Sequence, residues 1–274
     1  MSREKHWALV TGAASGIGKA VAVDLAAQGY NLLLADMNAD GLSELKAELG
    51  GFAVSVSLKV LDLADLSALD GFCDEIECFD GKLDYAFLNA GVVTPGDVLA
   101  LDRARLTRDV DVNLKSAMWL NQACARKMRS QGSGHIINTA SMAALVSLKG
   151  AASYSASKFG LRGFLIALRE ELRQNGVFVS MILPSAIDTP MLRYEAKNGG
   201  SALNFLSEPS SVEDVVRVFN KAQKSKKLEY FIPYSDSLMG RLVCIFPGIL
   251  GRFYSILSKL GERGRKRFLR GIDS

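Results

Sequence analysis

The 274-residue sequence contains few of the residues that build metal centres or disulfide frameworks. His6 and His135 are its only histidines, so a histidine-based zinc site or a Ser-His-Asp triad is hard to assemble. The four cysteines form no CxxC pair and follow no regular spacing, which favours reduced thiols over disulfides. We therefore expect no metal cofactor and a cytoplasmic protein.

The sequence also lacks long apolar runs, and it has no excess of basic residues before Arg241. The apolar run between Arg241 and Arg252 has only ten residues, which is too short to span a bilayer. The N-terminal segment lacks the apolar stretch and cleavage site of a signal peptide. The net charge is +4, but from Arg241 onward eight Lys and Arg residues stand against two acidic ones. Because the basic excess lies in one terminal segment, we do not expect nucleic-acid binding.

Short apolar runs alternate with longer amphipathic segments over most of the chain. This alternation is typical of βαβ units, so we predict an α/β fold, a doubly wound and mostly parallel Rossmann-type sheet. A catalytic domain over 1–235 would carry a helical extension over 236–274, and 185–210 reads as a loop with a short helix. The expected strands are 7–12, 31–36, 52–62, 83–91, 134–141, 177–185 and 228–233; the expected helices are 18–29, 39–50, 66–79, 102–132 (one or two), 154–176 and 211–227.

A glycine-rich turn, TGAASGIG, follows the first expected strand and opens the first helix. Such a turn needs residues free to adopt positive φ, and a pyrophosphate can approach the backbone only where Cβ atoms are absent. Asp36 ends the second strand eighteen residues beyond Gly18. A carboxylate there can accept hydrogen bonds from the ribose hydroxyls and repels a 2′-phosphate. The pattern therefore favours NAD over NADP.

Tyr154 and Lys158 are four residues apart at the start of an expected helix, so they lie on one helix face. A free tyrosine is a poor base at neutral pH, and a nearby cation favours its phenolate. Ser141 ends the fifth expected strand, and its hydroxyl can hydrogen-bond a substrate oxygen. The three residues together predict proton transfer to and from an alcohol or carbonyl oxygen.

Over roughly residues 5–235 the sequence resembles the short-chain dehydrogenase/reductase family. The resemblance implies that Tyr154 is the acid/base, that Lys158 binds the nicotinamide ribose and lowers the tyrosine pKa, and that Ser141 orients the substrate oxygen. It also implies that Asn113 interrupts its helix and holds a water, that Asp62 meets the adenine, and that Thr189 contacts the carboxamide. The implied cofactor-binding set is Gly12, Ser15, Gly16, Ile17, Gly18, Asp36, Asp62, Leu63, Asn89, Ala90, Gly91, Tyr154, Lys158, Pro184, Ile187 and Thr189.

Two positions qualify the resemblance. The family usually has Pro-Gly after the sixth strand, whereas this chain has Pro184-Ser185, which fits if the serine φ is negative. NADP-preferring members tend to carry basic residues in the glycine turn or just after the second strand. This chain has Ser15 and Met37 at those places, which again favours NAD.

The segment 238–270 combines an apolar stripe with a basic cluster. Pro247 and Gly248 are expected to break it into two short helices. Phe253, Ile256, Leu257 and Leu260 follow helical spacing, and basic residues follow them. One interpretation is a helix lying on an anionic membrane surface; the other is an apolar stripe that covers a substrate pocket or a subunit interface.

The leading hypothesis is an NAD(H)-dependent oxidoreductase that interconverts a lipophilic secondary alcohol, such as a steroid, retinoid or lipid-like alcohol, and its carbonyl. One alternative is an NADP(H)-dependent reductase of a small carbonyl compound. Another is a non-catalytic dinucleotide-binding sensor or scaffold, which the presence of Ser141, Tyr154 and Lys158 disfavours. The resemblance implies a homodimer or homotetramer with a small-molecule substrate. We expect specificity to reside in 93–99, 142–153 and 185–210.

Overall fold

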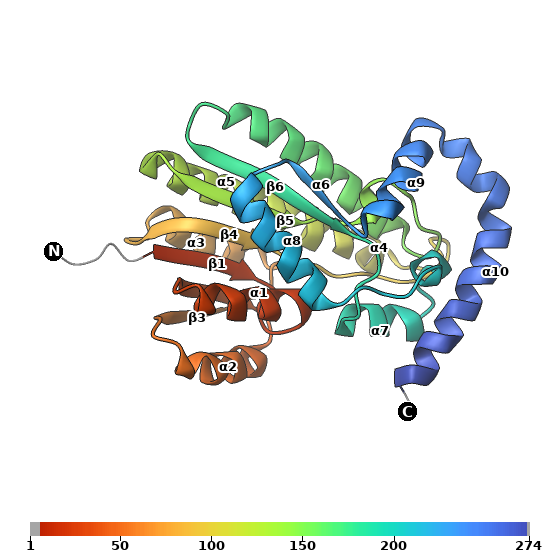
Figure 1. The fold of residues 1–274 in the computed structure, drawn as a ribbon, viewed down its shortest axis with the longest axis horizontal. Helices are drawn as coiled ribbons and strands as arrows, with labels where there is room; N and C mark the ends of the chain where they lie inside the picture. The colour runs from red at the N-terminus through yellow and green to blue at the C-terminus, as the bar shows by residue number, and fades with distance from the viewer. Residues whose placement is uncertain (1–5, 273–274) are drawn as a thin grey trace.

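Seven short apolar segments pair into one sheet in the computed structural model, which describes residues 6–272 (Figure 1). Their order is β3-β2-β1-β4-β5-β6-β7, and every pairing is parallel. This confirms the predicted Rossmann-type α/β fold. The strands are β1 (His6–Thr11), β2 (Asn31–Asp36), β3 (Val56–Val60), β4 (Lys82–Leu88), β5 (Gly134–Thr139), β6 (Val177–Pro184) and β7 (Glu229–Ile232).

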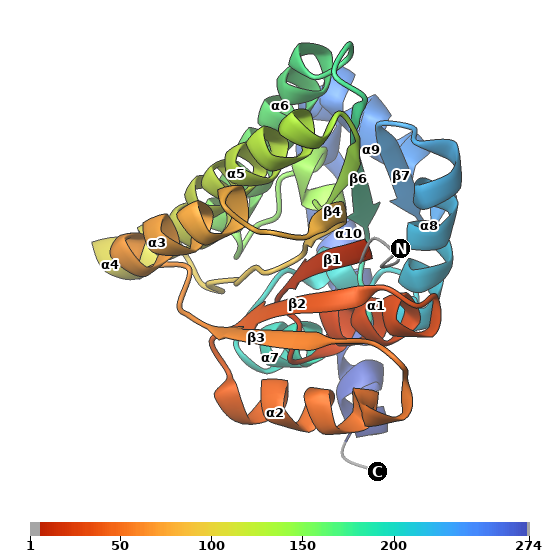
Figure 2. The same cartoon turned by 90° about the vertical axis from the view of Figure 1, so that its left-hand side faces the viewer.

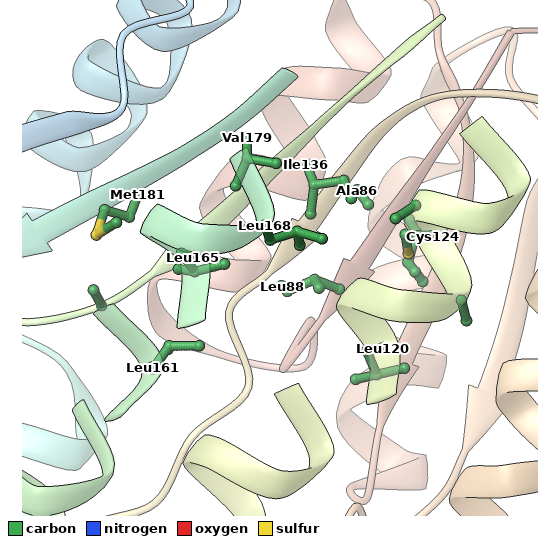
Figure 3. Packing of buried hydrophobic residues seen from close by; sticks show 14 of the residues in the cluster. Ala86, Leu88, Leu120, Cys124, Ile136, Leu161, Leu165, Leu168, Val179 and Met181 are labelled. Carbon is green, nitrogen blue, oxygen red and sulfur yellow. The ribbon is translucent and has the colours of Figure 1, made fainter. Parts of the chain in front are cut away.

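The sheet separates two hydrophobic cores, because successive strand residues point to opposite faces. Leu9 packs into one core and its neighbours Ala8 and Val10 into the other. One face is covered by α1 (Gly16–Ala27), α2 (Ala39–Glu48) and α8 (Val212–Ser225). The other is covered by α3 (Leu66–Glu77), α5 (Ser116–Gln131) and α6 (Ala152–Glu171), as Figure 2 shows, and α4 (Arg103–Val110) packs on α6. Figure 3 shows the packing of α5 and α6 on β4, β5 and β6.

The segment expected to form one or two helices over 102–132 forms two, joined by a π-helical turn, η2 (Asp111–Lys115). Asn113 lies inside this turn, so the interruption implied by the family resemblance is confirmed. Three further short turns are η1 (Leu49–Gly51), η3 (Met142–Ala144) and η4 (Ala202–Phe205).

The segment 185–210 carries more regular structure than expected. It contains α7 (Pro190–Lys197) as well as η4. Thr189 is the N-cap of α7, and its Oγ1 accepts a hydrogen bond from Leu192 N at 3.4 Å, while Pro190 occupies the first turn. Among the described residues only Lys226 has positive φ without being glycine, so Ser185 fits its position as expected.

The terminal segment forms α9 (Tyr234–Ile245) and α10 (Pro247–Ile272). The chain breaks at Phe246, directly before Pro247, as predicted, but the expectation of two short helices is wrong because α10 has 26 residues. Both helices lie beyond the carboxyl ends of the strands, at the right in Figure 1. Among residues 6–272 no helix has the length and apolar character needed to cross a membrane.

Candidate active site

A cavity of about 600 Å³ opens at the carboxyl edge of the sheet. The carboxyl ends of parallel strands meet along one edge, so side chains that follow different strands converge there. All the residues predicted for the site line this cavity except Gly18 and Asn113. The lining members are Gly12, Ser15, Gly16, Ile17, Asp36, Asp62, Leu63, Asn89, Ala90, Gly91, Ser141, Tyr154, Lys158, Pro184, Ile187 and Thr189.

The glycine turn leaves the start of α1 open to the cavity. Gly12 and Gly16 have φ values of +65° and +51°, which side chains rarely adopt. A Cβ on Gly18 would lie 2.0 Å from the Gly12 carbonyl oxygen, so Gly18 lets the helix pack under the turn. Ser15 is the N-cap but makes no side-chain cap hydrogen bond. The first-turn N–H groups are therefore left for a ligand, which fits an anionic pyrophosphate.

Asp36 is held rigidly at the end of β2. Its Oδ2 accepts a hydrogen bond from Ala14 N at 3.0 Å, and its Oδ1 accepts one from Asn38 N at 2.9 Å. Asp62 lies on the adjoining wall, where its Oδ1 accepts from Ala64 N at 2.9 Å. The carboxylates thus lie at one end of the cavity in fixed orientations.

The Asn89-Ala90-Gly91 segment ties three strand ends together. Asn89 N and Ala90 N donate to Thr11 Oγ1 at 3.0 and 3.1 Å, and Asn89 Oδ1 accepts from Thr139 Oγ1 at 2.9 Å. A Cβ on Gly91 would lie 3.1 Å from Asn113 Oδ1, so the glycine lets these groups approach closely.

Ser141, which is the N-cap of η3 just after β5, and Tyr154 and Lys158 of α6 converge on the cavity. Ser141 Oγ accepts from Ala143 N at 3.0 Å, and the Ser141 side chain interacts with the Tyr154 hydroxyl in the direction that lowers the tyrosine pKa. Lys158 Nζ lies 5.6 Å from the centre of the Tyr154 ring and donates to the Thr139 carbonyl at 2.9 Å. The structure therefore brings the predicted trio together.

Asn113 links the segment after β4 to α6 through its side-chain amide. Its side chain accepts from Val92 N at 2.8 Å and donates to Val92 O at 2.8 Å and to Ser157 Oγ at 3.2 Å. Because the amide is committed to these partners and buried, it holds the residues beside Lys158 rather than lining the cavity.

Burial shifts the pKa values of both Tyr154 and Lys158. Burial raises the pKa of Tyr154, the negative charges of Glu195 and Asp109 raise it further, and the Ser141 hydrogen bond lowers it. Burial also lowers the pKa of Lys158 to about 8, against the opposing effect of Asp109. Burial therefore dominates the pKa of both residues, and the role of Lys158 in lowering the tyrosine pKa stays a prediction.

Two buried acids near the tyrosine carry no sequence motif. Asp109 accepts hydrogen bonds from Thr94 Oγ1 at 2.8 Å and Ser153 Oγ at 2.6 Å. Glu195, on α7, lines the cavity, and one of its oxygens accepts from Asn204 Nδ2 at 3.3 Å. Burial, with the charge of Asp109, raises the pKa of Glu195 to about 7. Glu195 lies in the segment 185–210 that was expected to set specificity, but nothing in the pattern singled it out.

The wall opposite the glycine turn is largely apolar and comes from several elements. Of the three segments expected to set specificity, 142–153 and 185–210 contribute to this wall, whereas 93–99 does not. Helices α9 and α10 contribute as well, so the interpretation that the terminal segment covers a pocket is confirmed for part of it. The apolar members include Val92, Met142, Val146, Leu192, Leu203, Leu206, Met239, Val243, Leu250 and Leu257.

Comparison with known proteins decides the family. The family model described as short chain dehydrogenase matches residues 6–199. The chain is a short-chain dehydrogenase/reductase. It is therefore an enzyme of the dehydrogenase class that acts on CH–OH groups with NAD(P).

Two named relatives of this short-chain dehydrogenase differ in how much of the chain they match. A D-threitol dehydrogenase of Mycolicibacterium smegmatis is 36% identical over 203 residues, which is 73% of this chain and 77% of the relative. The human estradiol 17-beta-dehydrogenase 11 is 29% identical over 254 residues, which is 92% of this chain and 81% of the relative.

Solved structures of similar fold hold either cofactor. A short-chain dehydrogenase from Sphingobium yanoikuyae in complex with NADPH is 25% identical, with a TM-score of 0.77 over 86% of this chain and 92% of that one. One from Burkholderia phymatum in complex with NAD shares the fold, at 24% identity and a TM-score of 0.77 over 88% of this chain and 94% of that one. These neighbours leave the cofactor preference of this dehydrogenase to its own residues.

Proposed function

We propose that this enzyme interconverts a lipophilic secondary alcohol and its carbonyl compound, using NAD(H). One observation carries the proposal. The cavity has a fixed carboxylate, Asp36, at one end, an apolar wall at the other, and Ser141, Tyr154 and Lys158 among its lining residues. The first end suits the adenosine ribose of NAD, and the second suits an apolar substrate.

The preference for NAD rests on charge. Among the described residues, those that line the cavity near Asp36 include Ser15, Met37 and Asp62, and none of these three carries a positive charge. A ribose 2′-hydroxyl can donate a hydrogen bond to the carboxylate, whereas a 2′-phosphate would meet like charge. When bound, the nicotinamide supplies the hydride acceptor or donor. The glycine turn, with Gly12 and Gly16, would hold its pyrophosphate.

Ser141, Tyr154 and Lys158 carry out the proton transfer. In alcohol oxidation the Tyr154 oxygen takes the proton of the substrate hydroxyl, and in carbonyl reduction it returns one. Ser141 holds the substrate oxygen by a hydrogen bond. Lys158, anchored to the Thr139 carbonyl, supplies the positive charge that a phenolate needs once a ligand displaces water from the site. Thr189 would contact the carboxamide, and Asn113 fixes the turn beside Lys158.

The substrate class follows from the apolar wall. The relatives by themselves point both ways, since one is named for a polyol and the other for estradiol. A polyol needs several polar partners, whereas the wall built by η4, α9 and α10 is dominated by Leu203, Met239, Val243 and Leu257. We therefore favour a steroid-like, retinoid-like or lipid-like alcohol in a cytoplasmic homodimer or homotetramer.

The deciding experiment is a parallel fluorescence titration of the purified protein with NADH and NADPH. We expect NADH to bind at least tenfold more tightly, and Asp36→Ala to reduce that preference. Asp40→Ala, at an exposed acid beyond the cavity lining, is the matched control and should not change it. Tighter NADPH binding would support the reductase of a small carbonyl compound instead. Binding without turnover of any alcohol or carbonyl would support the dinucleotide-binding sensor or scaffold, and binding of neither dinucleotide would overturn the proposal.

A further inference from the structure

Large apolar side chains gather on the solvent side of the terminal helices. On α9 they include Leu238, Leu242 and Ile245, the last with 68% of its surface exposed. On α10 they are Phe253, Ile256 and Leu260, with exposed fractions of 54%, 60% and 48%. Single exposed apolar residues are ordinary, but a cluster on two consecutive helices marks an interaction surface.

The residues of α10 divide into three faces at helical spacing. The inner face packs on the protein. Tyr254 Oη accepts from Lys149 N at 2.9 Å, Leu257 lines the cavity, and the Phe268 ring contacts the Phe205 ring in a tilted geometry. An exposed apolar stripe runs through Phe253, Ile256 and Leu260. Beside it runs an exposed basic stripe, which consists of Arg252, Lys259, Arg263, Lys266 and Arg270. Packing of the inner face on the protein therefore does not explain why Phe253, Ile256 and Leu260 are apolar.

The same two helices form part of the substrate wall. Met239 and Val243 of α9, and Leu250 and Leu257 of α10, line the cavity that holds Tyr154. Met239 is also 62% exposed, so it stands where the cavity meets the outer surface. The exposed apolar stripe and the substrate cavity are thus separated by the thickness of one helix.

We propose that the outer faces of α9 and α10 dock on an anionic lipid surface, and that the apolar substrate enters the cavity from the lipid past Met239. The docking part stands on the surface alone; the entry part rests on the proposed function. Helices with an apolar stripe flanked by basic residues lie in the plane of the interface, with the apolar side chains in the acyl boundary and the charges at the headgroups.

The positive charge of the terminal helices favours a lipid surface over a second copy of this chain as the partner of this face. Residues from Arg241 onward carry eight Lys and Arg residues against two acidic ones. A two-fold contact through this face would bring each basic stripe toward its own copy, and like charges oppose that approach. Anionic headgroups complement the basic stripe, and the acyl region accepts the apolar stripe, so one lipid surface satisfies both.

The first test is co-sedimentation of the full chain with vesicles of phosphatidylcholine, with and without about 30% phosphatidylserine. We expect binding to the anionic vesicles, weakened at least tenfold by Phe253→Gln, Ile256→Gln and Leu260→Gln together. The charge variant Arg252→Gln, Lys259→Gln and Arg263→Gln should weaken it at least tenfold as well, since each basic residue adds about fivefold. Leu99→Gln, and Lys46→Gln with Arg173→Gln and Lys221→Gln, are the matched apolar and basic controls on other surfaces and should bind as the parent does.

The outcomes separate the two parts. If the parent protein does not sediment with anionic vesicles, or if the apolar triple variant binds them equally well, docking is wrong. A dimer that the triple variant dissociates would identify a second copy of this chain as the occupant instead.

Substrate entry from lipid is tested by turnover. Turnover of a vesicle-dissolved alcohol should fall at least fivefold in the triple variant, with turnover of a water-soluble alcohol unchanged. Equal rates on both would refute entry from lipid. NADH titration of each variant reports independently on the proposed function, so an inactive protein that binds vesicles would overturn that function and leave docking standing.

Discussion

Gly261 and Gly264 allow α10 to pack closely on η4, and a substitution at Gly261 tests that packing. A Cβ built on Gly261 would lie 2.0 Å from the Ala202 carbonyl oxygen of η4, where ordinary contact begins at 3.4 Å. A Cβ on Gly264 would meet the Phe205 carbonyl oxygen at the same distance. Because the obstacle is backbone on both sides, Gly261→Ala can be accommodated only if α10 moves away from η4.

The cost can be estimated from the contacts that this movement strains. Overpacking of this kind costs roughly 1–3 kcal/mol. The Phe205–Phe268 ring pair, whose centroids are 5.4 Å apart, contributes about 0.5–1.5 kcal/mol and is weakened as the helix shifts. A total of about 2 kcal/mol or more would raise the population of detached α10 about 30-fold. Most of the sheet makes no contact with this helix, so the opening is local and not global.

The assay is limited trypsin digestion, because Arg263, Lys266 and Arg267 become cleavable when α10 detaches. We expect Gly261→Ala to speed cleavage within α10 about 30-fold, to raise KM for an apolar alcohol, and to leave NADH binding unchanged. Gly251→Ala is the matched control, since its Cβ would meet nothing within 4 Å and alanine is the better helix former by about 1 kcal/mol. If Gly261→Ala and Gly251→Ala are cleaved equally slowly, the close packing of α10 on η4 does not hold the helix in place.

Three further predictions concern single titratable side chains. Tyr154→Phe keeps the ring but removes the proton carrier, so kcat should fall about 10²- to 10⁴-fold with NADH affinity unchanged; substantial residual turnover would sink the acid/base role. The pKa of Glu195 is raised to about 7, so its carboxyl ionises above that pH and then opposes phenolate formation at Tyr154. Glu195→Gln should therefore shift the rise of kcat/KM for alcohol oxidation to lower pH, and an unchanged pH profile would count against this coupling. Burial lowers the pKa of His135 to about 3, so the unfolded chain takes up a proton between about pH 6.5 and 3 that the folded chain does not. The free energy of unfolding should fall by up to about 1.4 kcal/mol per pH unit below pH 6, and His135→Phe should flatten that slope in urea titrations at several pH values.

The catalytic edge could be predicted from the sequence because parallel strands bring their carboxyl ends together. Asp36, Asn89, Ser141 and Pro184 each follow or end a strand, so their convergence needs only the strand assignments. The helical spacing of Tyr154 and Lys158 then places both on the face that meets Ser141. These inferences depend on local periodicity and on the topology of the sheet, which the apolar pattern encodes strongly.

The buried acids could not be predicted, because burial is decided by partners far away in the chain. Asp109 occurs in the charged run Arg105–Asp111, which reads as a solvated helix face. Its burial follows from contact of α4 with α6, where Thr94 and Ser153 supply the donors that make a buried carboxylate tolerable. Glu195 is similar: its environment comes from η4 and from the cavity, whose conformations no local pattern specifies.

The length of α10 could not be predicted from local sequence either. Gly248, Gly251, Gly261 and Gly264 lower helix propensity along the segment, and this favoured short helices in the sequence. Two of these glycines are where η4 backbone presses against the helix, so their small size is what lets a long helix form there.

The amphipathic pattern of α10 predicted that an apolar face exists but not which surface covers it. A single period of 3.6 residues can contain more than one apolar stripe, and only packing assigns each stripe a partner. Leu257, whose stripe meets the cavity, and Ile256, one position away, were indistinguishable in the sequence. The structure leaves Leu257 partly buried in the cavity wall and Ile256 60% exposed. The two interpretations of the terminal segment are therefore not exclusive, because the helix that closes the pocket with one face presents another to its surroundings. Gly261→Ala perturbs the first face and the Phe253, Ile256 and Leu260 substitutions perturb the second, so the two roles can be measured separately in one protein.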